Sequence, residues 1–183
     1  MEIFDKIDEL LSLKKEIVVA VDGCAASGKT TLAKILKERY DCQIIKMDDF
    51  FLPLNKRTEE RLSTPGGNID YERFKEEVID NLGSSFRYNV FDCSVMTLNG
   101  VSYINKNRLT IVEGSYSLHP YFGKYYDLSI FLDIDYEEQI RRIKDRNGEE
   151  MLKMFTSKWI KYEALYHEEF DIKNNVDIYI KVC

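Results

Sequence analysis

The sequence of 183 residues is poor in the residues that build metal centres and covalent frameworks. Its two histidines, His119 and His167, are too few for a histidine metal cluster. Its four cysteines stand far apart in the chain, at Cys24, Cys42, Cys93 and Cys183. Because no two of them show a short paired spacing, they indicate neither a zinc site nor a disulfide framework.

Long hydrophobic runs are also missing, since none approaches the roughly 20 residues of a membrane helix. Residues 1–5 carry acids where a secretory signal carries bases, so we expect a cytoplasmic protein without a membrane partner. The formal net charge of -6 argues against nucleic acid as the main partner, because clustered Lys and Arg hold phosphate backbones. One basic cluster stands out in this acidic chain: Arg141, Arg142, Lys144 and Arg146.

What the chain does contain is typical of a globular fold. Hydrophobic residues make up 44% and charged residues 32% of the composition, and we expect one domain over residues 1–183. Apolar runs rich in β-branched residues predict strands at residues 17–21, 42–47, 109–112, 128–132 and 176–182. Because helical patterns separate these runs, we predict a three-layer α/β fold with helices on both faces of a mostly parallel five-stranded sheet.

Helical spacing of apolar residues predicts helices near residues 3–11, 29–36 and 71–82. Residues 136–170 also have a helical pattern, with a break at Asn147-Gly148. An aromatic stripe from Phe155 to Phe170 is expected to lie in the core. Residues 87–104 predict a β-hairpin that turns at Asn99-Gly100, because both residue types tolerate positive φ.

A glycine-rich stretch, "VDGCAASGKTTLAKIL", follows the first predicted strand and opens a helix. Four residues separate Gly23 from Gly28, Lys29 and Thr30, which is the spacing of a phosphate-binding P-loop. Lys29 would contact the β- and γ-phosphates of ATP, and Thr30 would bind Mg²⁺. The predicted nucleotide-binding residues are Gly23, Cys24, Ala25, Ala26, Ser27, Gly28, Lys29, Thr30 and Thr31.

Two side chains beside this loop have no chemical role in our interpretation. Cys24 is a small filler residue, although its proximity to Lys29 could lower the pKa of its thiol. Asp22 is expected to end the strand and cap the turn.

Downstream segments separate kinases from other P-loop proteins. A GTPase would need Asn-Lys-x-Asp, which "NKNR" at 105–108 lacks, and a transport ATPase would need a strand that ends in Asp-Glu, which "TIVEG" lacks. Instead, "MDDFF" places Asp48 and Asp49 at the end of a predicted strand, at the edge where open α/β sheets bind ligands. A carboxylate there can accept the proton of an attacking hydroxyl late in phosphoryl transfer, or it can merely cap a turn.

The order of the short motifs resembles the uridine kinase and phosphoribulokinase group of P-loop kinases. After the P-loop come "MDDFF", "NIDYERF", "FDC", "VEGSY" and the arginine-rich stretch, and the resemblance covers residues 16–182. That group also includes nicotinamide riboside kinases and one type of pantothenate kinase. The resemblance implies ATP and Mg²⁺ as cofactors, a small-molecule hydroxyl as acceptor and a short helical lid over residues 141–150.

Residue by residue, the resemblance implies further roles. Asp48 matches the catalytic aspartate, and Asp70 matches the aspartate that binds ribose hydroxyls, although Asp70 could equally cap the following helix. Glu113 fits a magnesium ligand or an aid to the acceptor. Arg142 and Arg146 match lid arginines that stabilise the transferring phosphoryl group, although Arg142 could instead pair with acids on a solvated helix.

The acceptor side departs from the pattern of uridine kinases. Their base-reading tyrosine and histidine correspond here to Phe91 and Met96, which donate no useful hydrogen bond to a pyrimidine. Tyr116 is expected to line the acceptor site. Arg57 and Arg61 either hold an anionic acceptor or form an ordinary charged loop. His119 either donates to the substrate or caps its own loop.

We therefore expect an ATP- and Mg²⁺-dependent kinase of a small metabolite, with the 5′-hydroxyl of a nucleoside as the first candidate acceptor. Pantothenate, nicotinamide riboside and sugar phosphates are alternative acceptors. A nucleotide-dependent switch or binding module without an acceptor is the alternative from another class of function, and the oligomeric state stays open.

Overall fold

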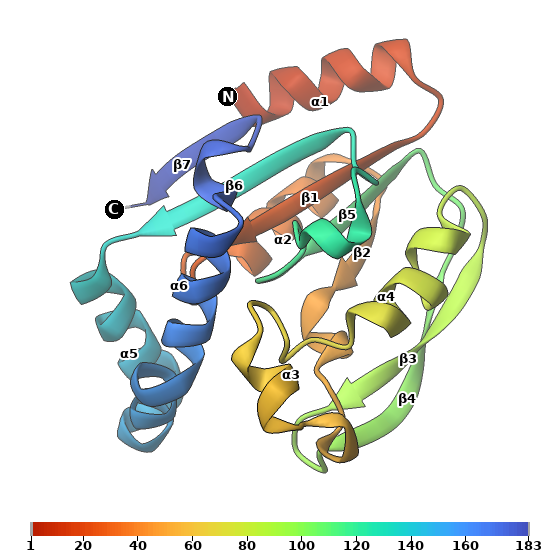
Figure 1. Cartoon of the computed structure of the whole chain (residues 1–183). Coiled ribbons are helices and arrows are strands. Elements are labelled where there is room, and N and C mark those ends of the chain that lie inside the picture. The colour runs from red at the N-terminus through yellow and green to blue at the C-terminus, as the bar shows by residue number, and fades with distance from the viewer. Residues whose placement is uncertain (1, 183) are drawn as a thin grey trace.

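The computed structural model describes residues 2–182, and Met1 and Cys183 lie outside the described residues. Its centre is a five-stranded parallel sheet with the strand order β2-β5-β1-β6-β7 (Figure 1). The strands are β1 (Ile17–Gly23), β2 (Gln43–Lys46), β5 (Leu109–Glu113), β6 (Leu128–Ile134) and β7 (Ile178–Val182). Every predicted strand of the sheet is present near its expected position, so the α/β fold is confirmed.

Helices cover both faces of the sheet. The helices of the described chain are α1 (Glu2–Leu13), α2 (Lys29–Arg39), α3 (Glu59–Ser63), α4 (Tyr71–Glu77), α5 (Tyr136–Met154) and α6 (Ile160–Glu169), of which α3 has no buried residue. On β1, Ile17, Val19 and Val21 pack in one core with residues of α1 and α2. Ala20 faces the second core, to which α4 and α6 contribute. Because side chains alternate along a strand, β1 is buried on both faces, which explains its continuous apolar run.

The hairpin of β3 (Phe86–Asp92) and β4 (Thr97–Ile104) is present, but it does not turn where the sequence predicts. Residues 93–96 make the turn, and Met96 has a φ of 57°. Asn99 and Gly100 lie inside β4, opposite Val90, at the point where the strand register shifts. The φ of 122° at Gly100 therefore serves a β-bulge and not the turn.

The C-terminal helical region agrees with the predicted break but not with the predicted burial. Gly148 interrupts α5 with a φ of 81°, and the π-helical segment η5 (Phe155–Trp159) leads into α6. Tyr166 is fully buried, whereas Trp159 is only partly buried and packs on Phe51 with ring centroids 5.9 Å apart. The expectation that the whole aromatic stripe lies in the core is wrong, because part of it faces the segment that follows β2.

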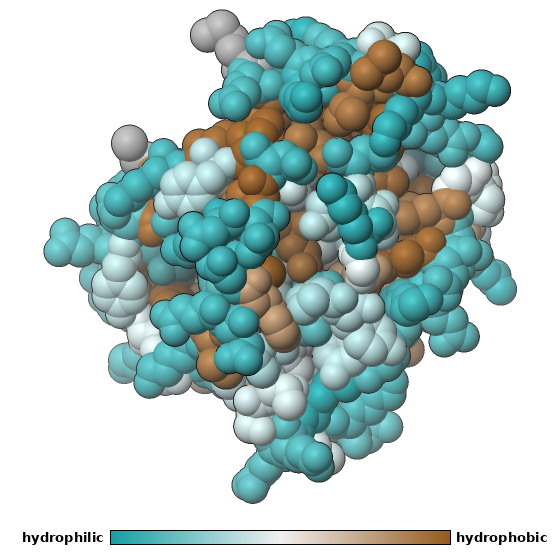
Figure 2. Space-filling model, turned by 45° about the horizontal axis from the view of Figure 1, so that its top comes forward, coloured by the Kyte–Doolittle hydropathy of each residue, from teal (hydrophilic) through white to brown (hydrophobic). Residues whose placement is uncertain are grey.

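The carboxyl ends of β1, β5 and β6 lie along one edge of the sheet, and the segment after β2 begins at the same edge (Figure 1). Figure 2 shows a largely hydrophilic face on which hydrophobic side chains gather near α1 and the sheet that it covers. Among residues 2–182, no helix combines the length and apolar character needed to cross a membrane.

Candidate active site

The P-loop joins the end of β1 to the start of α2, as the motif predicts. Gly23 has a φ of 140°, and a Cβ built on it would lie 2.1 Å from the carbonyl oxygen of Leu132. Both the backbone conformation and the close approach of β6 therefore require glycine at this position. Gly28, with a φ of 101°, leads the chain into α2.

Two side chains of the loop suit an anionic ligand. Lys29 Nζ donates to the carbonyl oxygens of Gly23 and Cys24 at 2.7 and 2.8 Å, which holds the ammonium group inside the loop. The hydroxyl of Ser27 is buried and has no hydrogen-bond partner among the described residues. A buried hydroxyl of this kind normally finds a partner, and a phosphate oxygen in the loop would supply one. The residues present therefore fit a nucleotide phosphate.

Thr30 and Glu113 meet at this edge and offer oxygen ligands to a cation. Thr30 Oγ1 lies 3.2 Å from each carboxylate oxygen of Glu113, which ends β5 and is 5% exposed. Burial and the charge of Asp48 raise the pKa of Glu113. Residues 2–182 contain no group of three or more His, Cys, Asp or Glu side chains that could hold a metal alone. A pair of oxygen donors suits Mg²⁺, which keeps several waters and shares substrate phosphates.

Asp48 and Asp49 occupy different environments although they are neighbours in η1 (Met47–Phe50). The Asp48 side chain is exposed at the edge, where its charge acts on Glu113. Asp49 is partly buried and accepts a hydrogen bond from the Tyr88 hydroxyl at 2.9 Å. Of the two acids, Asp48 is therefore the one that can receive a proton from a ligand.

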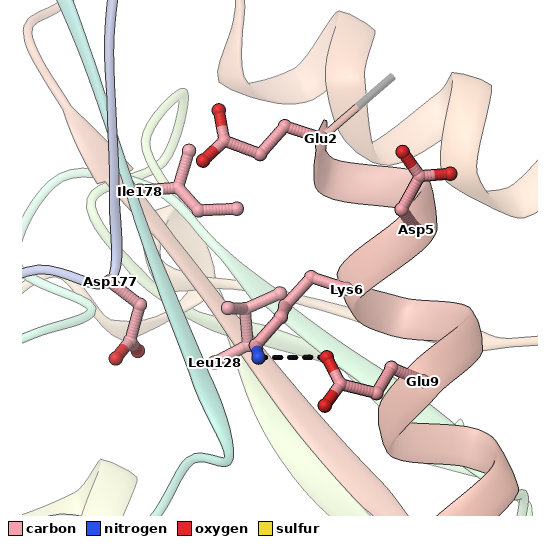
Figure 3. Close-up of a pocket in the computed structure, with 7 residues that line it drawn as sticks. All are labelled: Glu2, Asp5, Lys6, Glu9, Leu128, Asp177 and Ile178. Atoms are coloured by element: carbon pink, nitrogen blue, oxygen red, sulfur yellow. Dashed lines mark hydrogen bonds and ion pairs between the residues drawn. The ribbon is translucent and has the colours of Figure 1, made fainter.

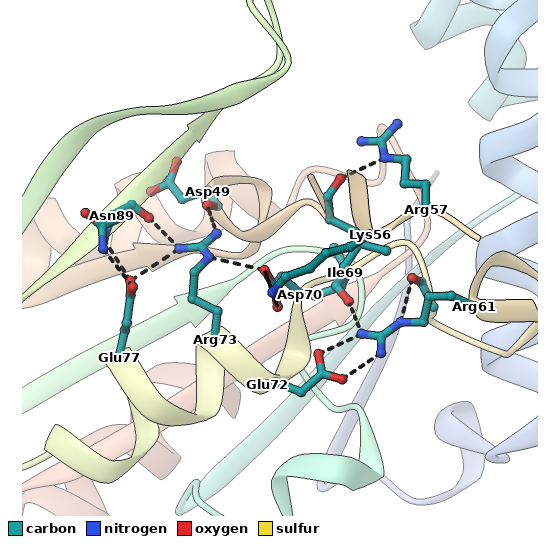
Figure 4. Close-up of polar contacts among 12 residues, drawn as sticks. Asp49, Lys56, Arg57, Arg61, Ile69, Asp70, Glu72, Arg73, Glu77 and Asn89 are labelled. Atoms are coloured by element: carbon teal, nitrogen blue, oxygen red, sulfur yellow. Dashed lines mark hydrogen bonds and ion pairs between the residues drawn. The ribbon is translucent and has the colours of Figure 1, made fainter. Parts of the chain in front are cut away.

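Asp70 does not cap α4 with its side chain, so that alternative is excluded. Its carboxylate is 1% exposed and receives Lys56 Nζ at 3.1 Å, and Arg73 Nε lies 3.6 Å away (Figure 4). Arg73 also donates to the carbonyl oxygen of Asp49 at 2.7 Å, which links α4 to η1. A ligand diol would have to compete with Lys56 for this carboxylate.

Three further residues expected near an acceptor are used by the protein itself. Tyr116 is buried, with its ring 4.9 Å from that of Tyr166, and Phe91 is buried on β3. His119 accepts a hydrogen bond at Nδ1 from the backbone of Tyr121, and its Nε2 lies 3.1 Å from the carbonyl oxygen of Pro65. The structure therefore favours the loop-capping interpretation of His119. Contact of Tyr116 or Phe91 with a ligand stays a prediction.

The lid arginines lie on α5, which starts beside the P-loop edge. Arg142 donates to Glu138 at 2.6 Å and approaches the carbonyl oxygen of Ala26 in the P-loop at 3.5 Å. Arg146 is exposed and donates to the side chain of Asn147. Hydrogen bonds from Arg141 and Arg142 lower the pKa of Glu138 to about 2. Arg142 thus combines the predicted acid pairing with a position next to the nucleotide loop.

The sequence patterns did not identify the residues of α5 and α6 that bind the backbone of the P-loop. Glu163 on α6 accepts hydrogen bonds from the Ala25 amide at 2.9 Å and the Ser115 hydroxyl at 2.6 Å. Gln139 on α5 donates to the carbonyl oxygen of Ala25 at 3.0 Å. Helices α5 and α6 therefore fix the peptide groups on both sides of Ala25. Burial raises the pKa of Glu163, and the charge of Lys29 opposes this effect.

Asp22 is fully buried and caps the turn, as expected. It accepts hydrogen bonds from the backbone amides of Gly23, Tyr116 and Leu118 and from the Tyr166 hydroxyl. One carboxylate thereby joins the P-loop, the segment after β5 and α6.

The structure agrees with the interpretation of Cys24 as a filler residue, and it contradicts the alternative that Lys29 lowers the pKa of the thiol. Cys24 Sγ donates to Asp133 at 3.2 Å, and burial together with this carboxylate raises the pKa of the thiol to about 12. The cation that opposes this shift is Lys173, and its effect is smaller than those of burial and Asp133.

A cavity of about 570 Å³ lies away from this site, between α1 and the starts of β6 and β7 (Figure 3). Its lining residues are Glu2, Asp5, Lys6, Glu9, Leu128, Asp177 and Ile178. The four carboxylates outnumber the single ammonium group, which itself pairs with Glu9 at 2.8 Å. This cavity would repel phosphate groups and is not the nucleotide site.

Comparisons with known proteins find a relative among the kinases. Nicotinamide riboside kinase 1 of Homo sapiens is 29% identical over 142 residues, which cover 72% of this chain and 66% of that protein. The chain thus spans slightly less than two thirds of that relative.

Solved structures share the fold at low sequence identity. The structure of a "possible uridine kinase" from Bacillus stearothermophilus has a TM-score of 0.67 and 19% identity, and the match covers 98% of this chain and 100% of that chain. YFH7 from Saccharomyces cerevisiae has a TM-score of 0.65 and 16% identity, with coverage of 100% and 98%.

The family described as "AAA domain" matches residues 19–163, which include the P-loop, Asp48, Glu113, the whole of α5 and the start of α6. The chain therefore belongs to this AAA domain family of P-loop proteins.

Proposed function

We propose that the protein is an ATP- and Mg²⁺-dependent kinase that phosphorylates a hydroxyl of a small metabolite. The observation that carries this proposal is the exposed carboxylate of Asp48 at the same edge as Lys29, Thr30 and Glu113. A P-loop alone serves switches and motors as well. A carboxylate at this edge that is not held by another side chain of the described residues can accept a hydrogen bond, and later the proton, from an acceptor hydroxyl. The kinase names of the human relative and of the Bacillus structure support the same reaction class.

The residues divide the work of phosphoryl transfer between them. When bound, ATP supplies the phosphoryl group and Mg²⁺ neutralises charge on its phosphate oxygens. Lys29 and the amides of residues 23–31 would hold the phosphates, and Thr30 with Glu113 would hold the cation. Asp48 would orient the acceptor hydroxyl and take its proton late, because a carboxylate is too weak a base to deprotonate an alcohol beforehand.

The arginines of α5 would stabilise charge on the transferring group. Arg142 already lies next to Ala26, and Arg146 extends from the exposed part of the same helix before the Gly148 kink. Guanidinium groups disperse the charge of a phosphoryl transition state, and closure of residues 141–150 over the loop would exclude water.

The 5′-hydroxyl of a nucleoside is the first acceptor to test, because both kinase-named relatives suggest it. Asp70 is the residue that would bind the ribose diol, after displacement of Lys56. Pantothenate and sugar phosphates complete the set of candidate acceptors. The product in each case would be a phosphate monoester, formed together with one ADP.

The proposal is tested by ADP release from ATP and Mg²⁺ with and without each acceptor. Acceptor-dependent ADP release is expected, and Asp48→Asn should lower turnover by about 10²- to 10⁴-fold while ATP affinity is retained. Asp41→Asn, which alters an exposed acid before β2 at the other edge of the sheet, is the matched control. Slow ADP release that no acceptor stimulates, or full turnover of Asp48→Asn, would contradict the kinase proposal and favour a nucleotide-dependent switch.

A further inference from the structure

A single buried arginine joins the elements of the proposed acceptor side. Arg73 lies on α4, one turn after Asp70, and is 8% exposed. A guanidinium carries five N–H donors and a permanent charge, so its burial is unfavourable unless these donors meet acceptors. Figure 4 shows the Arg73 side chain between Asp49 of η1, Asp70 and Asn89 of β3. The contacts that compensate its burial therefore lie on three different parts of the acceptor side.

The first contact holds the segment that carries Asp48. Arg73 Nη2 donates to the carbonyl oxygen of Asp49 at 2.7 Å, and the guanidinium carbon lies 4.3 Å from the centre of the Phe50 ring. Asp49 and Phe50 directly follow Asp48 in η1, which has only four residues. Because so short a 3-10 helix has weak hydrogen bonds of its own, the direction of Asp48 depends on what holds the residues beside it.

The second contact joins the hairpin to the same guanidinium group. Arg73 Nη1 donates to the carbonyl oxygen of Asn89 on β3 at 2.5 Å and lies 3.3 Å from a carboxylate oxygen of Glu77. Tyr88, the neighbour of Asn89, donates its hydroxyl to Asp49 at 2.9 Å. The two terminal nitrogens of Arg73 thus bind one carbonyl oxygen on η1 and one on β3, and the planar group fixes the spacing between these elements.

The third contact reaches Asp70. The backbone amide of Asp70 donates to the carbonyl oxygen of Phe50 at 2.8 Å, so α4 begins against η1. Arg73 Nε is buried without a hydrogen-bond partner among the described residues, and it lies 3.6 Å from a carboxylate oxygen of Asp70. The other cation at this carboxylate, Lys56, has a side chain that is 53% exposed. A ligand that displaced Lys56 would leave Arg73 as the remaining cation beside Asp70.

These contacts are separate from the nucleotide side. Among residues 2–182, Arg73 makes no hydrogen bond or ion pair with the P-loop, which Gln139 and Glu163 hold instead. Loss of Arg73 should therefore disturb the acceptor side while phosphate binding is left intact. A general loss of packing would not separate the two sides in this way.

From these contacts we infer that Arg73 is a positioning residue for both acids of the acceptor side. It fixes the peptide groups that direct Asp48 toward the acceptor hydroxyl, and it keeps a cation beside Asp70 while a ligand is bound there. Asp48, exposed in a short segment, thereby gains the fixed direction that proton transfer requires. The inference rests on the proposed kinase function and adds to it a residue that acts through these two acids.

Conservative substitution of Arg73 separates its shape from its charge. Arg73→Lys keeps the positive charge, but an ammonium group lacks the planar fork that binds the carbonyl oxygens of Asp49 and Asn89 together. With the acceptor that most stimulates ADP release by the wild-type chain, kcat should fall by about 10- to 10²-fold, because a small displacement of a reacting group has an effect of this size. The Kd of a non-hydrolysable ATP analogue, measured by calorimetric titration with Mg²⁺, should stay unchanged.

A second variant, Arg73→Gln, removes the charge as well. Because Asp70 then loses its buried cation, this variant should also raise the KM of the acceptor, by about tenfold, whereas Arg73→Lys should raise it less. Arg108→Lys is the matched control, since Arg108 also donates to a backbone carbonyl oxygen, that of Leu11 at 2.6 Å, but lies before β5 at the opposite edge of the sheet. Its kcat and KM should equal those of the wild-type chain.

Hydrogen exchange measures the positioning without any acceptor. In Arg73→Lys, the amides of residues 47–52 and of β3 should exchange faster than in the wild-type chain, because local opening becomes easier there. The amides of residues 23–30 in the P-loop should exchange at an unchanged rate. Faster exchange throughout the molecule, or no change at residues 47–52, would overturn the inference. Circular dichroism verifies folding, and Arg73→Lys alone decides if Arg73→Gln does not fold.

The inference and the kinase proposal fail in different ways. Normal kcat of Arg73→Lys in a chain that phosphorylates an acceptor, or equal losses of kcat and of ATP-analogue binding, would overturn the inference and keep the kinase. If the wild-type chain releases no acceptor-dependent ADP, the kinase proposal fails, and the exchange measurement alone decides whether Arg73 positions η1.

Discussion

The two sides of the candidate active site are built in opposite ways. On the nucleotide side, charged groups are buried and held by fixed partners, as Lys29 is by loop carbonyls and Glu163 by the Ala25 amide. On the acceptor side, Asp48 and Lys56 are exposed, and both lie in short segments between the sheet and the hairpin. The comparison shows charged groups held by fixed partners at the proposed phosphate loop, and exposed charged groups on the proposed acceptor side.

The largest effect should follow from Lys29→Ala. Removal of this ammonium group should lower turnover by about 10²- to 10³-fold, because no other cation of the described residues contacts the carbonyl oxygens of Gly23 and Cys24. Lys34→Ala, on the exposed side of the same helix, should leave turnover unchanged. Normal ATP consumption by the Lys29 variant, measured as ADP release, would remove the P-loop assignment.

Gly23→Ala should destabilise the P-loop through a steric clash alone. The added Cβ meets the Leu132 carbonyl oxygen at 2.1 Å in a backbone conformation that disfavours alanine, so the free energy of unfolding should fall by about 4 kcal/mol. Gly148→Ala, at a φ of 81° with open space around it, should cost about 1–2 kcal/mol. Urea denaturation measures both, and equal losses would show that the contact between β1 and β6 is not limiting.

Glu163→Gln should change the pH dependence of stability. Burial raises the pKa of Glu163 above its ordinary 4.5, so between these two values the native state holds a proton that the unfolded state has released. The free energy of unfolding then falls as pH rises through this interval, by up to about 1.4 kcal/mol per pH unit. Glu163→Gln should flatten that slope above pH 4.5.

Two features make this measurement specific. Asp22 remains in the variant, and since burial raises its pKa as well, a smaller slope of the same sign should persist. Glu149→Gln is the control: Lys144 lowers the pKa of this exposed acid, so its removal should not affect the slope above pH 4.5. An unchanged slope in Glu163→Gln would show that this carboxyl is ionised throughout.

The smallest effect concerns two thiols, one on each side of the site. Cys24, with a pKa raised to about 12, should resist alkylation at pH 8, because about one thiol in 10⁴ is ionised there. Cys93 is exposed at the hairpin turn and should react at least tenfold faster. Peptide mass spectrometry after timed iodoacetamide treatment measures both rates, and faster labelling of Cys24 would contradict its burial against Asp133.

The P-loop could be predicted well from the sequence, because its conformation depends on residues that are close together in the chain. A strand, a glycine at each end of a short loop and a lysine at a helix start fix the P-loop within eight residues, Gly23 to Thr30. Local rules fail where one preference suits two structures. Asn99-Gly100 tolerates a turn and a bulge equally, and only the pairing of β4 with β3 decides between them.

The remaining features depend on partners far away in the chain. The Cys24 thiol is governed by Asp133. Arg61 is held by Glu72, by the carbonyl oxygens of Gly67 and Ile69 and by the Tyr71 ring, contacts that Arg57 lacks. The burial of Glu163 could have been predicted from one sequence feature. Glu163 shares a helix face with Trp159 and His167, so it is an acid within an otherwise aromatic stripe. An acid on such a face predicts a buried polar contact, although not its partner.

The hold on Ala25 from two helices has a practical consequence. Since Gln139 and Glu163 grip successive peptide groups of one loop residue, a displacement of either helix must reach the nucleotide cradle, and the reverse also applies. Met151, which is 43% exposed and lies in α5 after the Gly148 kink, is therefore a suitable position for a fluorescent reporter of the proposed nucleotide binding.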